Sequence, residues 1–206
     1  MVKLPREPRV PLSHEPADLI TLGTDTLLWR LHATTGTYTL PWDRLRFYGP
    51  TPSRFDPQLE PPGPSERGVT YASTEIVTVL AEAFQATRAI DAVTAGPHLT
   101  GWSPARSLTL LDLTGDWPLR HGASQALTSG IKSSCRAWAR AIYDAFPEID
   151  GLWSRSSLRD GTVVALWTPA ADSFPAAPTF SRPLSAPGLR ERIWACAKTI
   201  GYDVLA

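Results

Sequence analysis

Apolar and polar residues follow two periods along the chain. Short apolar runs typical of buried strands occur at residues 26–32 (TLLWRLH), 68–72 (GVTYA), 107–113 (SLTLLDL) and 162–167 (TVVALW). Residues 73–89, 123–146 and 188–200 repeat apolar side chains every three or four positions, which predicts three main amphipathic helices. A terminal YDVL strand follows Gly201. Five or six short strands and three helices without regular alternation predict an α+β domain with small mixed or antiparallel sheets.

Three segments show neither period. Residues 1–18 contain four prolines and scattered charges, which predicts an extended N-terminal arm ahead of a single domain over residues 19–206. Residues 41–67 are dense in proline and glycine and are predicted to be irregular, and loops of this length are usually functional or mobile. We therefore expect this segment to be a lid or a partner surface. Residues 169–187 are predicted to form a proline-rich connection.

Composition narrows the class of protein. The formal net charge is zero over 206 residues, which argues against a general nucleic-acid or polybasic membrane surface. The chain contains no apolar run of 18 residues and no signal-peptide pattern, so we expect a cytoplasmic protein without membrane association. Lysine accounts for only three of the 20 basic residues. This bias fits a GC-rich genome, or arginines that bind phosphate or carboxylate through their bidentate fork.

Several familiar kinds of site are missing from the sequence. Neither GxGxxG nor GxxxxGK[ST] occurs, so the usual dinucleotide and triphosphate loops are absent. HExxH and GxSxG are absent as well, and the four histidines lie in unrelated contexts. Cys135 and Cys196 lie on predicted helices without zinc-ligand spacing, so we interpret them as core residues and predict no metal.

Two arginines are candidates for chemistry. Arg30 interrupts the apolar LLWRLH run, so it must either face solvent on the alternate side of the strand or be paired. Arg54 lies in PSRFDP within the long irregular segment, where a solvated loop arginine is the simple interpretation.

Polar residues also occur at two boundaries of predicted elements. Tyr71 ends a strand just where a helix is predicted to begin, and Glu82 lies on that helix in a polar stripe that can equally be solvated. The cluster Ser154–Ser157 precedes the apolar strand VVALW, and Asp160-Gly161 already supplies a turn. A serine-rich turn is ordinary, so each feature alone leaves the bland interpretation open.

Together these features resemble the RES domain family, which is named for an arginine, a glutamate and a serine. LWRLH, RFDP, GVTYAS with VLAEAF, and GLWSRSS with VVALW occur in the family's order between about Leu27 and Trp167. The resemblance implies a catalytic set of Arg30, Glu82 and Ser156, with Arg54, Tyr71 and Ser157 as binding residues. Ser157 is also the next candidate for the family serine if the register is shifted by one residue.

The resemblance implies an ADP-ribosyltransferase-like fold and a toxin of a bacterial toxin–antitoxin pair that consumes NAD+ as its substrate, by hydrolysis or phosphorolysis. Its implied partner is an antitoxin with a helix-turn-helix domain, and a homodimer is a further expected arrangement. Some members instead transfer ADP-ribose to a protein. Many members carry a tyrosine where this chain has Ser154, and residues 58–67 are unusually rich in proline. These departures leave a non-catalytic, partner-binding domain as a third alternative.

The matched residues suit cleavage of the nicotinamide–ribose bond. The leaving group is a cationic pyridinium, so the reaction needs no metal, and its transition state has oxocarbenium character. Glu82 can stabilise that positive charge, and Ser156 can fix the ribose or the carboxamide. Tyr71 can stack on nicotinamide, while Arg30 and Arg54 can hold the diphosphate.

Overall fold

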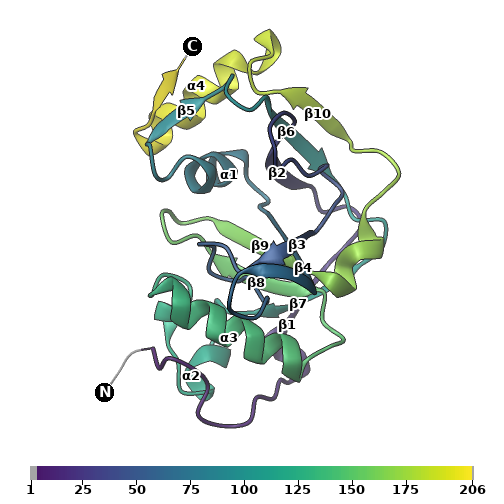
Figure 1. Ribbon diagram of the computed structural model, residues 1–206, viewed down its shortest axis with the longest axis vertical. Helices are drawn as coiled ribbons and strands as arrows, with labels where there is room; N and C mark the ends of the chain where they lie inside the picture. Colours follow the sequence, from purple (N-terminus) through teal and green to yellow (C-terminus); the bar gives the residue numbers. More distant parts are fainter. Residues whose placement is uncertain (1–3, 206) are drawn as a thin grey trace.

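Three β-sheets organise the computed structural model, which describes residues 4–205 (Figure 1). The strands are β1 (Leu19–Leu22), β2 (Leu28–Ala33), β3 (Arg46–Gly49), β4 (Gly63–Ala72), β5 (Ala89–Asp91), β6 (Pro97–Trp102), β7 (Leu108–Asp112), β8 (Gly151–Arg155), β9 (Thr162–Trp167), β10 (Phe180–Pro183) and β11 (Asp203–Leu205). The α-helices are α1 (Ile76–Ala83), α2 (Trp117–Arg120), α3 (Lys132–Ala145) and α4 (Arg190–Ile200), and 3₁₀ helices occur at Pro16–Asp18, Gln125–Leu127, Thr168–Ser173 and Pro187–Leu189.

The largest sheet is mixed and has the strand order β1-β7-β8-β9-β4-β3. Only β7 and β8 pair in parallel within it. The second sheet, β10-β6-β2, is antiparallel, and the third is a parallel pair, β11-β5. Reciprocal backbone hydrogen bonds between Trp29 and Ser73, of 2.7 and 2.9 Å, join the edge of the second sheet to the end of β4. The predicted single α+β domain with mixed and antiparallel sheets is confirmed.

Side chains on the two faces of the large sheet belong to two different hydrophobic cores, because successive residues of a strand point to opposite faces. One face, including Leu152 and Ala165, packs with Trp138 and Ile142 of α3. The other face packs against the second sheet through residues such as Leu110, Val164, Leu28 and Trp102. A third core lies between α1, α4 and the sheets around them.

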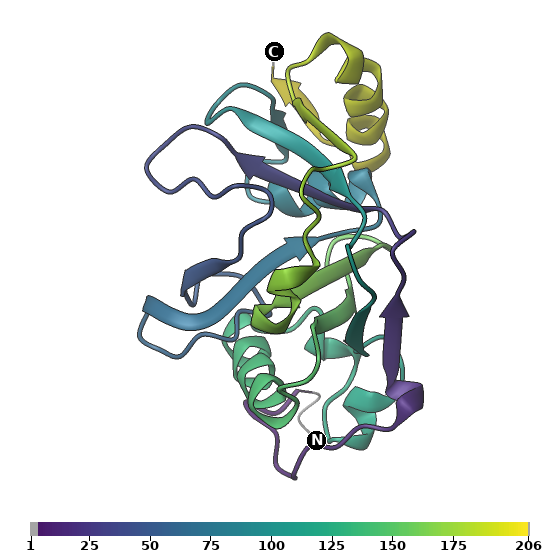
Figure 2. The ribbon, with the colours of Figure 1, turned by 90° about the vertical axis from the view of Figure 1, so that its right-hand side faces the viewer.

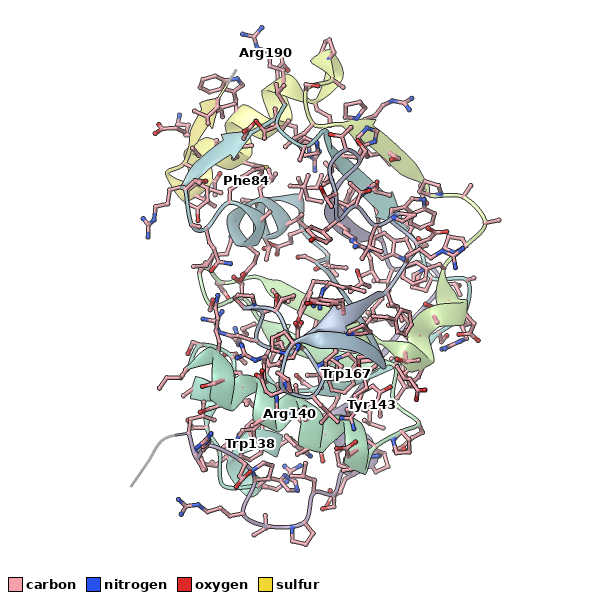
Figure 3. The ribbon with its side chains drawn as sticks, viewed as in Figure 1. Phe84, Trp138, Arg140, Tyr143, Trp167 and Arg190 are labelled. Carbon is pink, nitrogen blue, oxygen red and sulfur yellow. The ribbon has the colours of Figure 1, made fainter. Side chains whose placement is uncertain are left out.

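The third core and the α3 core lie at opposite ends of the molecule. Figure 3 shows Phe84 beside α1 and α4, and Trp138, Tyr143 and Trp167 in the half that contains α3. Figure 2, the view turned by 90°, shows β4 as a long strand that projects from the body between the two halves. Each end of the molecule therefore has its own hydrophobic core. The strands between the two cores position the residues that lie where the two halves meet.

The structure corrects the predicted helix boundaries. α1 begins at Ile76 rather than near Ser73, because the backbone of Ser73 still pairs with Trp29. The chain leaves α1 at Phe84, well before the predicted end at Ala89. The predicted helix 123–146 is also divided into the 3₁₀ turn Gln125–Leu127 and α3. Gly130, a residue type that weakens helix interiors, lies at this interruption.

Ile131 and the helix α3 show where the predicted apolar stripe holds and where it fails. Cys135, Trp138 and Ile142 are fully buried, as their spacing predicts. Ile131 lies four residues before Cys135, a spacing that predicts the same stripe, but it is 75% exposed because it is the N-cap residue before the helix begins. α1, α3 and α4 are the predicted three main helices, and α2 is a single additional turn.

Strand prediction was less complete, because residues 4–205 contain eleven strands rather than five or six. The segment 41–67 is not wholly irregular, since it contains β3 and the first half of β4. GLWSR is strand β8 rather than part of a turn. β6 (PHLTGW) gave no signal because proline and glycine are disfavoured in strands. Gly101 is nevertheless required there, since a Cβ atom would lie 2.7 Å from the Trp29 ring.

The described part of the predicted N-terminal arm packs along the α3 half of the molecule. Residues 4–15 contain no helix or strand, and residues 1–3 of the predicted arm lie outside the described residues. The indole of Trp138 donates to the Pro5 carbonyl at 3.0 Å, and the indole of Trp117 donates to the Ser13 carbonyl at 2.8 Å. The predicted boundary between the arm and the domain at residue 18 stays a prediction.

Within residues 4–205, no helix combines the length and the apolar character needed to cross a membrane.

Candidate functional site

A cavity of about 250 Å³ lies where the two halves of the domain meet. Its walls are the loop 52–55, the end of β4, the polar side of α1, the first residue of α3 and the β8–β9 hairpin. β2 contributes Leu31. The charged residues of the lining are Arg54, Glu82, Lys132 and Arg155. Three cations and one carboxylate give the cavity a positive balance of charge.

The cavity brings together four of the six residues predicted from the sequence. Arg54, Tyr71, Glu82 and Ser157 all line it, although they come from a loop, a strand, a helix and a hairpin. Ser156 lies directly behind Glu82, and is only 9% exposed. Arg30 is the sixth residue and does not line this cavity.

Glu82 and Ser156 are joined directly by a short hydrogen bond. The Ser156 hydroxyl donates to Glu82 Oε1 at 2.6 Å and accepts the amide N–H of Leu158 at 3.1 Å. Gln85 Nε2 donates to the Glu82 carbonyl at 2.9 Å. The serine therefore fixes one carboxylate oxygen from the protein side, while Glu82 itself faces the cavity.

Arg159 fastens the hairpin that carries Ser156 to the first turn of α1. Its guanidinium donates to Glu75 Oε2 and to the Thr78 hydroxyl, and Thr78 in turn donates to Glu75 Oε2 at 3.0 Å. Burial acts to raise the pKa of Glu75, but the hydrogen bonds from Arg159 and Thr78 outweigh it and lower the pKa below its usual value. The neighbouring Arg155 instead forms an exposed pair with Asp160 at 3.1 Å.

We predict that Arg159→Met loosens this hairpin. Loss of the charged hydrogen bonds is expected to cost about 1 kcal/mol, which corresponds to roughly fivefold faster local opening. Hydrogen exchange of the Ser156 amide, which is bonded to Gly161 O at 2.7 Å, would report the change. Arg155→Met is the matched control, because exposed pairs contribute little. Equal exchange rates in the two variants would contradict the proposed fastening.

Tyr71 is oriented by a buried carboxylate that the sequence analysis did not single out. Its hydroxyl donates to Asp56 Oδ1 at 2.7 Å and accepts the Phe55 N–H at 3.2 Å. Asp56 is fully buried and also binds Arg46 through both oxygens at 2.8 Å. Burial, together with the adjacent Asp56 carboxylate, raises the pKa of Tyr71 well above its usual value. The phenol therefore stays protonated and holds its ring in place at the cavity wall.

Arg30 is partly buried and supports a neighbouring segment. Its guanidinium donates to the backbone carbonyls of Trp42 and Arg44, at 2.9 and 3.1 Å. Burial, with a smaller contribution from the charge of Arg46, lowers the pKa of Arg30 to about 10, so it remains charged at neutral pH. The sequence left two interpretations of Arg30, a solvent-facing side chain or a paired one. The structure shows a paired arginine, and its partners are backbone carbonyl oxygens rather than a carboxylate.

Ser154, which occupies the position of the tyrosine found in many RES members, does not reach the cavity. It is fully buried, and its hydroxyl donates to the Val163 carbonyl at 3.2 Å. The position therefore belongs to the β8–β9 pairing in this chain.

In residues 4–205, no group of three or more histidine, cysteine, aspartate or glutamate side chains is arranged to hold a metal ion.

Two polar atoms of the site point to an unfilled binding role. Arg54 Nε and Ser157 Oγ are buried but have no hydrogen-bond partner in the described part of the chain. Buried polar atoms are nearly always satisfied, by protein, water or ligand. The cavity therefore presents two unsatisfied polar groups with which a polar ligand can form hydrogen bonds.

The fold and the cavity define a class: an α+β domain with a cleft whose charged residues give a positive balance and which contains one fixed carboxylate. A protein-family model described as "RES domain" matches residues 27–186. The chain therefore belongs to the RES domain family, as its motifs indicated.

A solved structure adds a comparison at the level of the fold. A chain from the "Crystal structure of the M.tuberculosis MbcT-MbcA toxin-antitoxin complex" aligns with a TM-score of 0.53 and 17% identity, covering 85% of this chain and 92% of that chain. At this identity the match shows a shared fold alone. No curated protein sequence matches the chain.

Proposed function

We propose that the protein is a toxin-type enzyme that cleaves the nicotinamide–ribose bond of NAD+. The observation that carries this proposal is Glu82, which faces a net-positive cavity while Ser156 fixes one of its oxygens at 2.6 Å. Membership of the RES domain family and the orphaned atoms of Arg54 and Ser157 support it. With water as the acceptor, NAD+ and H₂O give nicotinamide, ADP-ribose and one proton.

Glu82 supplies the main electrostatic contribution to the proposed reaction. As the glycosidic bond lengthens, positive charge moves from the pyridinium onto the ribose, and a nearby carboxylate stabilises that charge. Ser156 keeps Oε1 oriented, while Oε2 has only a long hydrogen bond of 3.5 Å from Gln85 Nε2, so in the proposal Oε2 is the oxygen that faces the ribose. Because the group is positioned before substrate arrives, little reorganisation is needed in the transition state.

The other residues of the cavity hold the substrate. In the proposal Tyr71 presents an uncharged ring to the nicotinamide, and Asp56 and Phe55 keep that ring from rotating away. Ser157 offers an unsatisfied hydroxyl to the ribose or the carboxamide. Arg30 keeps residues 42–44 in place through two carbonyls, which makes it a support of the cleft.

A cognate antitoxin belongs to the same proposal. The structurally similar chain comes from a toxin–antitoxin complex, which supports a protein partner for this protein. A cytoplasmic location of both partners is part of the proposal. A helix-turn-helix domain on that partner and a homodimer of the toxin remain parts of the proposal that rest on the family resemblance. The segment 41–67 is proposed to contribute to the lid or partner surface.

One assay separates the enzymatic alternatives. The purified protein is incubated with NAD+ labelled in the ADP-ribose part, with and without phosphate and cell extract. Nicotinamide release with label only in small molecules supports NAD+ degradation, and dependence on phosphate identifies phosphorolysis. Label on a protein band would replace this function with mono-ADP-ribosylation at the same site. No nicotinamide release under any condition would leave a non-catalytic, partner-binding domain.

A further inference from the structure

Lys132 is a cavity residue to which neither the family motifs nor the sequence analysis gave a role. It is the first residue of α3, and it lines the cavity together with Arg54. We infer that Lys132 joins Arg54, to which the family resemblance already gives the diphosphate, in an anion subsite that receives the phosphate groups of the substrate at the α3 side of the cavity. The inference rests on the proposed function, because it assigns the diphosphate of NAD+ to these two cations.

The first argument is that both cations are uncompensated. Within residues 4–205, neither Arg54 nor Lys132 has a hydrogen bond or an ion pair to a side chain or carbonyl. The nearby acidic groups are already engaged: Asp56 binds Arg46, and Glu60 lies 3.4 Å from Arg136. A buried guanidinium nitrogen without a partner is costly, and an anionic ligand would remove that cost.

The second argument is that the two cations converge on one end of α3. Both side chains line the same cavity, and Lys132 is the first residue of α3. The positive charge of Arg54 also acts on the Cys135 thiol of that helix, against the rise in its pKa that burial causes. Cys135 lies three residues after Lys132, so both side chains lie on the same helix face. The N-cap residue Ile131 provides no side-chain hydrogen bond, so the positive end of the helix dipole adds to the two charges.

The third argument concerns the orientation of the substrate. The nicotinamide end of NAD+ is cationic and the diphosphate is anionic. The cavity carries Glu82 on α1 and Lys132 on α3, two helices that lie in different halves of the molecule (Figure 1), and Arg54 is its second unpaired cation. Charge complementarity therefore directs the glycosidic bond to Glu82 and the phosphates to Arg54 and Lys132. Arg155 also lines the cavity, but its charge is shared with Asp160.

A series of three substrates tests the subsite. NAD+ carries a diphosphate, nicotinamide mononucleotide carries one phosphate, and nicotinamide riboside carries none, while all three contain the same scissile bond. We expect Lys132→Gln and Arg54→Gln each to raise KM for NAD+ about tenfold or more, with kcat changed little. The increase should be smaller for the mononucleotide and absent for the riboside. Lys198→Gln, an exposed change on α4, is the matched control and should alter none of the three.

Binding provides a readout that does not depend on turnover. Calorimetry with ADP-ribose should show at least tenfold weaker binding for Lys132→Gln than for the wild-type protein and for Lys198→Gln. Such weakening would support the subsite even if wild-type protein fails to cleave NAD+, in which case the proposed function alone fails. The subsite is overturned if wild-type protein does not bind ADP-ribose, or if the variants lose equal affinity or activity toward the riboside and the dinucleotide.

Discussion

Glu82→Gln is expected to reduce nicotinamide release from NAD+ by about 10²–10³-fold, by analogy with the loss of a single preorganised electrostatic group from other active sites. The substitution removes the negative charge but keeps the side chain's shape. Its Oε1 atom can still accept the hydrogen bond that Ser156 donates at 2.6 Å. The loss should therefore appear in kcat and kcat/KM together, because the charge acts in the transition state. Steady-state kinetics with NAD+ would measure it.

The folded structure should be nearly unaffected by this change. We expect the melting temperature of Glu82→Gln to remain within about 2 °C of wild type, since no buried ion pair is broken. Glu191→Gln on the exposed face of α4 is the control for loss of a carboxylate, and it should retain full activity. Wild-type kcat in Glu82→Gln would refute the assigned role. A large fall in melting temperature would instead mean that Glu82 is a structural residue.

The sequence predicted the main helices and the buried strands because their apolar patterns are long or continuous. TVVALW is β9 at the predicted boundaries, and the TLLWRLH run contains β2. β6 and β10 could not be found in this way. Each carries proline and is defined by pairing with a neighbour distant in sequence, as in the register of Phe180 with Gly101. Such tertiary pairing leaves little trace in local composition.

The candidate site was predicted through motifs rather than through periodicity. The order of those motifs pointed to Glu82 and Ser156, which the structure brings into direct contact. It gave no sign of Asp56, Arg159 or Lys132. Asp56 lies two residues after Arg54 in PSRFDP, and its buried role depends on Tyr71 and Arg46, which only the fold brings together. Arg159 likewise acquires a role only when its hairpin meets α1.

The cavity depends on two fastened segments more than on any single element. Arg159 ties the serine hairpin to α1, and Asp56 ties the loop 51–56 to β3 and β4. The first fastening sets the position of Ser156 behind Glu82. The second sets the positions of Tyr71 and Arg54. A defect in either should change the geometry of the cavity without touching the proposed reacting groups.

Asp56→Ala is expected to lower the free energy of unfolding by about 3–5 kcal/mol, the usual cost of removing one partner of a buried ion pair. The fully buried carboxylate accepts hydrogen bonds from Arg46, from the Thr51 amide and hydroxyl at 2.6 and 2.8 Å, and from Tyr71. Without it the Arg46 charge and the donors of Thr51 and Tyr71 lose their acceptor. At about 2–4 °C per kcal/mol, the melting temperature should fall by roughly 10 °C.

Two further variants make the Asp56 prediction specific. Tyr71→Phe removes one hydrogen bond to Asp56 and should cost only about 1 kcal/mol. Asp172→Ala removes a carboxylate that lies 2.6 Å from Arg106 but is 73% exposed, and it should cost less than about 1 kcal/mol because solvent screens the pair. Thermal and denaturant unfolding would rank the three. If Asp56→Ala unfolds no more easily than Asp172→Ala, the loop that carries Arg54 is held by its backbone alone, and the buried carboxylate does not organise the cleft.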